Sequence, residues 1–208
     1  MKRLEKILGI IVLIALIMKF TLIPLSNVLF LLSLSILACI YYPLGFALFN
    51  QIGFKQIFKK DSYKGLSALR ILGAIGVGTT LSLICVGVLF KLLHWPGAMI
   101  QLISGLVSTL IILIVALIRY FKSKSEYLIN IIKRICVVGG LGLLLAIASD
   151  LTIVRIQFRN HPEYIKAFEL YEANPNDETL IKNLDIEYHR ATMSEKEFEI
   201  YLKYIEKQ

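Results

Sequence analysis

The chain has 208 residues, of which 57% are hydrophobic and 18% are charged, and its mean hydropathy is +0.70. This composition excludes an ordinary water-soluble globule and also excludes intrinsic disorder. The formal net charge of +8 is not a nucleic-acid footprint, because the basic residues flank apolar runs and set orientation in a membrane.

Five apolar runs are long enough to cross a bilayer as helices, which takes about 20 residues each. They cover residues 7–25, 28–49, 71–90, 98–118 and 135–154. The short connections predict two tight hairpins, one from the first two runs and one from the next two. Only Asp150 interrupts the fifth run. The sequence therefore predicts an all-α, polytopic membrane bundle with five spans over residues 1–154, followed by a tail.

Basic residues gather before the first run, between the second and third runs, and between the fourth and fifth runs. Because cytoplasmic loops collect Lys and Arg, the N-terminus is predicted to be cytoplasmic. Five crossings then place the C-terminus on the other side of the membrane, outside the cytoplasm. From Asp150 onward the chain holds 12 of the 15 acidic residues and 8 of the 23 basic residues. If the fifth run did not cross, this tail would be cytoplasmic.

The tail, residues 155–208, changes to the periodicity of short amphipathic helices. Helix starts are predicted at Pro162, after Asp177, and at a capping box formed by Ser194 and Glu197. The apolar stripes predict a buried face, which includes Phe168, Leu180, Leu184, Phe198 and Leu202. This face could be covered in two ways, which the sequence supports equally. A membrane or periplasmic protein docks on it, or it packs against the rest of the chain or the lipid headgroups.

Small residues recur every four positions in the later runs, which predicts seams where neighbouring helices approach closely. These residues are Ala74, Gly78, Ser82, Gly105, Thr109, Gly142 and Ala146. A substrate path lined by hydroxyl groups is the less favoured interpretation. Association with a second copy of the chain is left open.

Charged residues near the ends of spans are candidates for function. Asp150 lies four residues after Ala146 and eight after Gly142, so these three are predicted to share one face of the fifth helix. Lys91 and His94 are expected at the same depth, and an ion pair or proton relay is conceivable there. Anchoring at the interface is favoured over such a relay. The turn beside them carries Trp95, Pro96 and Gly97.

The three cysteines, Cys39, Cys85 and Cys136, lie alone in separate apolar runs, without the spacing of a disulfide or metal site. A phosphate loop, a hydrolase elbow and a zinc motif are also missing from the sequence. The expectation is a protein that is not an enzyme and needs no cofactor or metal.

The segment Gly87–Ala98 resembles the transmembrane hairpin of GldL, the gliding-motility membrane protein of Bacteroidota. Phe90, Lys91 and His94 match the Phe-Lys-x-x-His turn of that family, and the His-Trp-Pro-Gly form is similar to small uncharacterised membrane proteins of the same bacteria. The resemblance covers about residues 71–118. GldL-type proteins resemble proton-driven motor stators, which need an acid in the second helix. Thr109 stands at that position here, so the resemblance implies compartment and lineage but not the ion-driven mechanism.

These patterns together predict an integral membrane protein that serves as a non-enzymatic accessory or scaffold subunit. The resemblance to GldL implies a bacterial inner membrane, with the C-terminus in the periplasm, and an envelope complex that acts in gliding or secretion. Its partners would be the lipid bilayer and a protein docked on the tail, with no nucleic acid. The alternative is a small ion-coupled transporter or channel-like protein that uses Asp150, Lys91 and His94.

Overall fold

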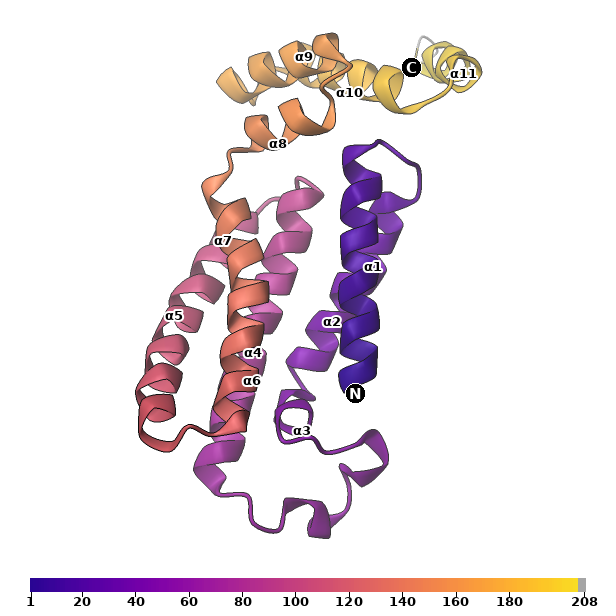
Figure 1. Cartoon of the computed structure of the whole chain (residues 1–208). Helices are drawn as coiled ribbons and strands as arrows, with labels where there is room; N and C mark the ends of the chain where they lie inside the picture. The colour runs from indigo at the N-terminus through magenta and orange to yellow at the C-terminus, as the bar shows by residue number, and fades with distance from the viewer. Residues whose placement is uncertain (206–208) are drawn as a thin grey trace. The chain divides into compact units, whose positions relative to one another are not determined.

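A computed structural model describes residues 1–205, and within this range the chain is helical without a strand (Figure 1). The prediction of an all-α fold is confirmed for these residues. The chain divides into two compact units: the bundle unit, residues 1–17 and 25–148, and the tail unit, residues 18–24 together with residues from 149 onward. The boundary thus falls six residues before the predicted one at residue 154.

Most of the bundle unit is made of helices that run alongside one another (Figure 1). They are α1 (Lys2–Phe20, whose last residues belong to the tail unit), α2 (Ser26–Tyr41), α3 (Gly45–Phe49), α4 (Ala68–Leu92), α5 (Ala98–Ser123), α6 (Glu126–Arg134), the π-helical turn η3 (Ile135–Gly139) and α7 (Gly140–Ile147). Two short 3-10 turns, η1 (Phe54–Gln56) and η2 (Lys60–Tyr63), lie between α3 and α4. By length and composition, three stretches could cross a membrane: α4, α5 and the continuous stretch Glu126–Ile147.

Local sequence explains where these helices begin and end. The Ser67 hydroxyl accepts a hydrogen bond from the backbone N–H of Arg70 at 3.3 Å and caps the start of α4. Gly97 precedes α5 with a φ of 83°, a conformation that glycine adopts without steric cost. Pro43 lies in the break between α2 and α3, because proline has no N–H to donate and its ring interrupts a helix.

The fifth predicted span, 135–154, is wrong in its position. The apolar helix in the structure runs over Glu126–Ile147 through α6, η3 and α7. The start of this helix is not recognised from hydropathy, because α6 carries three charged residues, Glu126, Lys133 and Arg134, which lower the mean hydropathy of this segment. The length of an apolar run alone therefore places the start of such an amphipathic helix too late in the sequence.

The same stretch ends earlier than predicted. Ala148 has an extended backbone, with ψ at 124°, which stops α7. Ser149 then caps a separate helix, α8 (Asp150–Gln157), by accepting a hydrogen bond from the backbone N–H of Thr152 at 3.1 Å. The chain after residue 148 therefore belongs to the tail unit.

Helix α4 is the centre of the bundle unit, since it contacts α2, α3, α5, η3 and α7. Leu81, Ile84 and Leu102 are fully buried between these helices. By contrast, large apolar side chains on the outer faces of α1 and α5 are exposed, and they include Ile7, Ile10, Leu13, Ile17, Ile100, Val107, Ile111 and Ile118. Such faces suit lipid, because lipid is an apolar solvent.

The tail unit has a core of its own, formed by Val154 and Phe158 of α8 and by Tyr164 and Phe168 of α9 (Pro162–Ala173). Phe158 and Tyr164 have ring centroids 4.2 Å apart. Burial raises the pKa of the Tyr164 phenol, with Tyr188 adding to the rise, so this phenol stays protonated even in alkaline solution that ionises an exposed tyrosine.

The three amphipathic helices predicted in the tail are present as α9, α10 (Glu178–Thr192) and α11 (Glu195–Ile205). Asp177 caps α10 by accepting a hydrogen bond from the backbone N–H of Thr179 at 2.8 Å. The hydroxyl and backbone N–H of Ser194 donate to Glu197 and hold the pKa of its carboxyl below the usual range. The capping signals in the sequence are therefore confirmed.

Candidate functional site

Of the predicted polar cluster, Lys91 and His94 lie together at the end of α4. Lys91 is buried, and its Nζ lies 3.9 Å from the sulfur of Met99 on α5. The backbone N–H of His94 donates to the carbonyl of Lys91 at 3.3 Å, with a φ of 54° at His94. This pair belongs to the bundle unit.

Asp150 is placed differently from the prediction. The break at Ala148 ends α7, so Asp150 is the first residue of α8 in the tail unit and does not share a helix face with Gly142 and Ala146. A carboxylate in the first turn of a helix is favoured by the helix dipole. Asp150 therefore lies beyond the helical stretch that could cross a membrane, which ends at Ile147, and its predicted meeting with Lys91 and His94 stays a prediction.

The turn Trp95, Pro96 and Gly97 closes the hairpin of α4 and α5. The backbone N–H of Trp95 donates to the carbonyl of Phe90 at 2.8 Å, and their rings meet edge to face at 5.3 Å. Together with the left-handed backbone at Gly97, these contacts give the turn a structural role that requires no ligand.

The small residues lie where helices of the bundle unit approach closely. Ala74 is fully buried, and a Cβ added at Gly78 would overlap the carbonyl oxygen of Tyr41 and lie 3.1 Å from the Cα of Gly45. An added Cβ at Gly105 would lie 2.8 Å from Ile84, and one at Gly142 would lie 2.6 Å from the same side chain. Ser82 and Ala146 are partly buried, while Thr109 is buried with its hydroxyl unpaired.

The predicted docking face of the tail is divided between core and surface. Phe168 belongs to the core of the tail unit, and Leu184 packs against it. Leu180, Phe198 and Leu202 are partly buried. Different apolar residues point outward, namely Leu170, Ile181, Met193, Ile200 and Tyr204.

A partly buried ionic cluster that the sequence patterns do not predict joins three helices. It is formed by Glu5 of α1, Tyr41 of α2 and Arg134 of α6. We call it the Glu5 cluster. The guanidinium of Arg134 donates twice to the Glu5 carboxylate, from Nε at 2.6 Å and from Nη2 at 2.7 Å. The Tyr41 hydroxyl donates to the same carboxylate at 3.0 Å.

The surroundings of the Glu5 cluster exclude most of the solvent. The side chains of Arg134 and Glu5 are 16% and 12% exposed. Arg134 lies 5.4 Å from the centre of the Phe49 ring, and that ring stacks on Tyr41 at 6.3 Å. Because its donors and acceptors face one another, the cluster fits a clamp between helices.

One sequence signal could have indicated this cluster. Glu5 is the only acidic residue among the first 60 positions and lies within a basic N-terminal segment. Its partner could not be found by spacing, because Glu5 and Arg134 are 129 residues apart.

Within residues 1–205, the structure brings together no group of three His, Cys, Asp or Glu side chains that could hold a metal ion. Comparisons of the chain with family models, with curated proteins and with solved structures gave no match. The resemblance to GldL stays a prediction.

Proposed function

We propose that the chain is a five-span inner-membrane protein that acts as a non-enzymatic scaffold subunit of an envelope complex and docks a partner through its tail. Three helical stretches could cross a membrane. The apolar outer face of α1 and the succession of α2 and α3 support two further crossings. The N-terminus would then be cytoplasmic and the tail periplasmic.

The observation that carries the scaffold role is the outward apolar surface of α10 and α11. The tail unit already has its own aromatic core, yet Ile181, Ile200 and Tyr204 remain 44%, 69% and 63% exposed. We call these three residues the tail patch. Large apolar side chains left exposed on a small polar unit are typical of surfaces that bind another protein.

The docking role is tested by crosslinking in native membranes, followed by purification of the full chain in mild detergent. We expect Ile200→Asp to lose the crosslinked partner, because it puts a charge into the tail patch while leaving the core intact. Glu199→Gln, a neighbouring exposed position, is the matched control and should retain it. The docking proposal is wrong if Ile200→Asp, Tyr204→Asp and the unmodified chain all recover the same partners.

The topology has a separate test by thiol labelling. With Cys39, Cys85 and Cys136 replaced by Ala, a cysteine at exposed Asn183 should react with an impermeant reagent added to spheroplasts. A cysteine at Lys64, in the basic loop between α3 and α4, should react only after the membrane is opened. Reaction of both positions from the same side would contradict five crossings.

A further inference from the structure

A cavity of about 530 Å³ lies within the bundle unit, between α4, α5 and the start of α6. Its interior is apolar, with walls that include Val77, Ile112 and Ile131. Gly73 and Gly76 of α4 widen it, and a Cβ added at Gly73 would meet no atom within 4 Å. The volume lies in the range of sites that hold small organic molecules, about 300–1,000 Å³.

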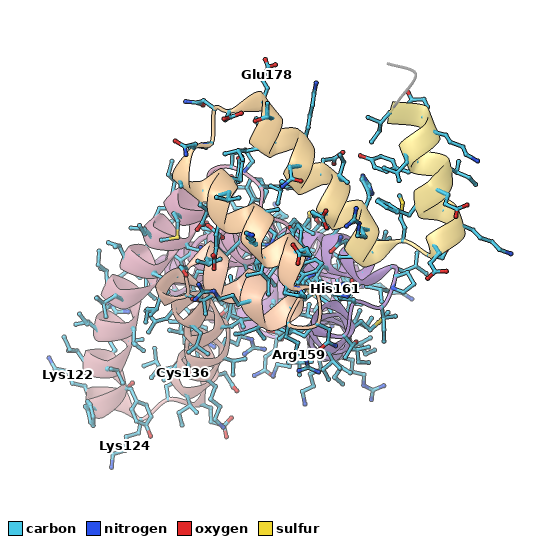
Figure 2. All side chains as sticks on the ribbon, turned by 90° about the horizontal axis from the view of Figure 1, so that it is seen from above. Lys122, Lys124, Cys136, Arg159, His161 and Glu178 are labelled. Carbon is cyan, nitrogen blue, oxygen red and sulfur yellow. The ribbon has the colours of Figure 1, made fainter. Side chains whose placement is uncertain are left out.

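Three cations, Arg70, Arg119 and Lys122, line the same cavity. They come from the first turn of α4 and the last turns of α5, which are antiparallel neighbours, so all three lie at one end of the bundle unit. Figure 2 shows the side chain of Lys122 extending outward from α5. The cavity therefore has a basic rim and an apolar interior.

Arg70 is held in place at this rim. Its Nε donates to the side-chain oxygen of Asn50 at 2.8 Å, and its guanidinium lies 4.3 Å from the centre of the Tyr127 ring. The Tyr127 hydroxyl donates to the backbone carbonyl of Arg70 at 3.3 Å. These contacts fix the guanidinium while leaving its terminal nitrogens available for an anion.

Among the residues that the structure describes, no carboxylate forms an ion pair with the cations of the rim. The residues that line the cavity include no Asp or Glu. An anion at the rim would supply the missing charge.

The depth of the cavity follows from helix register. Counted from the rim residues Arg70 and Arg119, the lining residues extend to Val77 on α4 and back to Ile111 on α5. Seven residues of α-helix correspond to roughly 10 Å. An occupant would thus place its anionic group at the rim and an apolar chain along this length.

We propose that this cavity binds an anionic phospholipid, with the phosphate at Arg70, Arg119 and Lys122 and the upper part of one acyl chain between α4 and α5. Orientation in the membrane explains why cations collect at this end, but it does not explain an apolar cavity beneath them. Basic pockets between membrane helices fit anionic headgroups, and an attached chain suits the apolar wall. The site does not depend on docking through the tail.

The test is lipid binding to the purified full chain, measured by native mass spectrometry with phosphatidylglycerol and phosphatidylcholine of identical acyl chains. We expect one phosphatidylglycerol per chain, bound at least about tenfold more tightly than phosphatidylcholine. The double variant Arg70→Gln with Arg119→Gln should lose about tenfold or more in affinity. Gly73→Leu should lose as much without any change in charge, because its side chain fills the cavity.

Lys124→Gln is the control, since it removes a cation from the same loop at a position that does not line the cavity. It should bind phosphatidylglycerol like the unmodified chain. Val115→Trp, which obstructs the cavity from α5, provides a second filled variant if Gly73→Leu does not fold. The proposal is overturned if filled and unmodified chains bind alike, if both lipids bind equally, or if excess inorganic phosphate displaces the lipid.

Discussion

Glu5→Gln should lower the free energy of unfolding of the chain by up to about 3–5 kcal/mol, because it leaves the partly buried guanidinium of Arg134 without its counter-charge. Both hydrogen bonds from Arg134 end on the Glu5 carboxylate, at 2.6 and 2.7 Å. The exposed fractions of 16% and 12% leave little water to replace them. Reversible unfolding in mixed micelles, followed by circular dichroism, measures the change.

Two further variants separate the cost of an unpaired charge from the worth of the pair. Replacing Glu5 and Arg134 together by Leu removes both charges, so most of the lost stability should return. Asp61→Asn breaks the ion pair between Asp61 and Lys64, whose side chains are 83% and 81% exposed, respectively. This variant should cause no measurable change in the free energy of unfolding. If Glu5→Gln unfolds like Asp61→Asn, the Glu5 cluster is not a clamp.

Elements of the fold could be predicted where the residues of the element itself determine where it begins and ends. The runs 71–90 and 98–118 correspond to α4 and α5 within a few residues, because apolar length and the turn at Gly97 both act locally. The predicted position of the fifth span is shifted toward the C-terminus, because the charged residues of α6 lower the hydropathy at the start of this helix. Its end was missed because the break at Ala148 is marked by neither proline nor glycine.

The candidate sites were harder to predict because their partners are distant in sequence. A period of four indicated that Gly78 lies on a packed face, but not that it contacts the backbone of Tyr41. The Glu5 cluster and the basic cavity depend on which helices become neighbours, and side-chain spacing along one helix does not determine that. Residues with an unusual charge for their segment, such as Glu5, are the exception.

Gly78→Ala should destabilise the chain by about 1–3 kcal/mol, because a methyl group there would overlap the carbonyl oxygen of Tyr41. The added Cβ would also lie 3.1 Å from the Cα of Gly45, so backbone atoms on both sides of the α2–α3 break would have to move. Gly73→Ala is the matched control on the same helix. Its Cβ would meet nothing within 4 Å, so it should leave stability unchanged or raise it by less than about 1 kcal/mol.

Gly78→Ala should also weaken the Glu5 cluster, because Gly78 contacts Tyr41, and the Tyr41 hydroxyl donates to Glu5. Displacing the backbone of Tyr41 moves that hydroxyl away from the carboxylate. In a double-mutant cycle, Gly78→Ala and Tyr41→Phe should therefore be non-additive, with a coupling energy of about 0.5–3 kcal/mol measured by unfolding in mixed micelles. Strict additivity would show that the close approach of α2 to α4 and the ionic clamp stabilise the bundle independently.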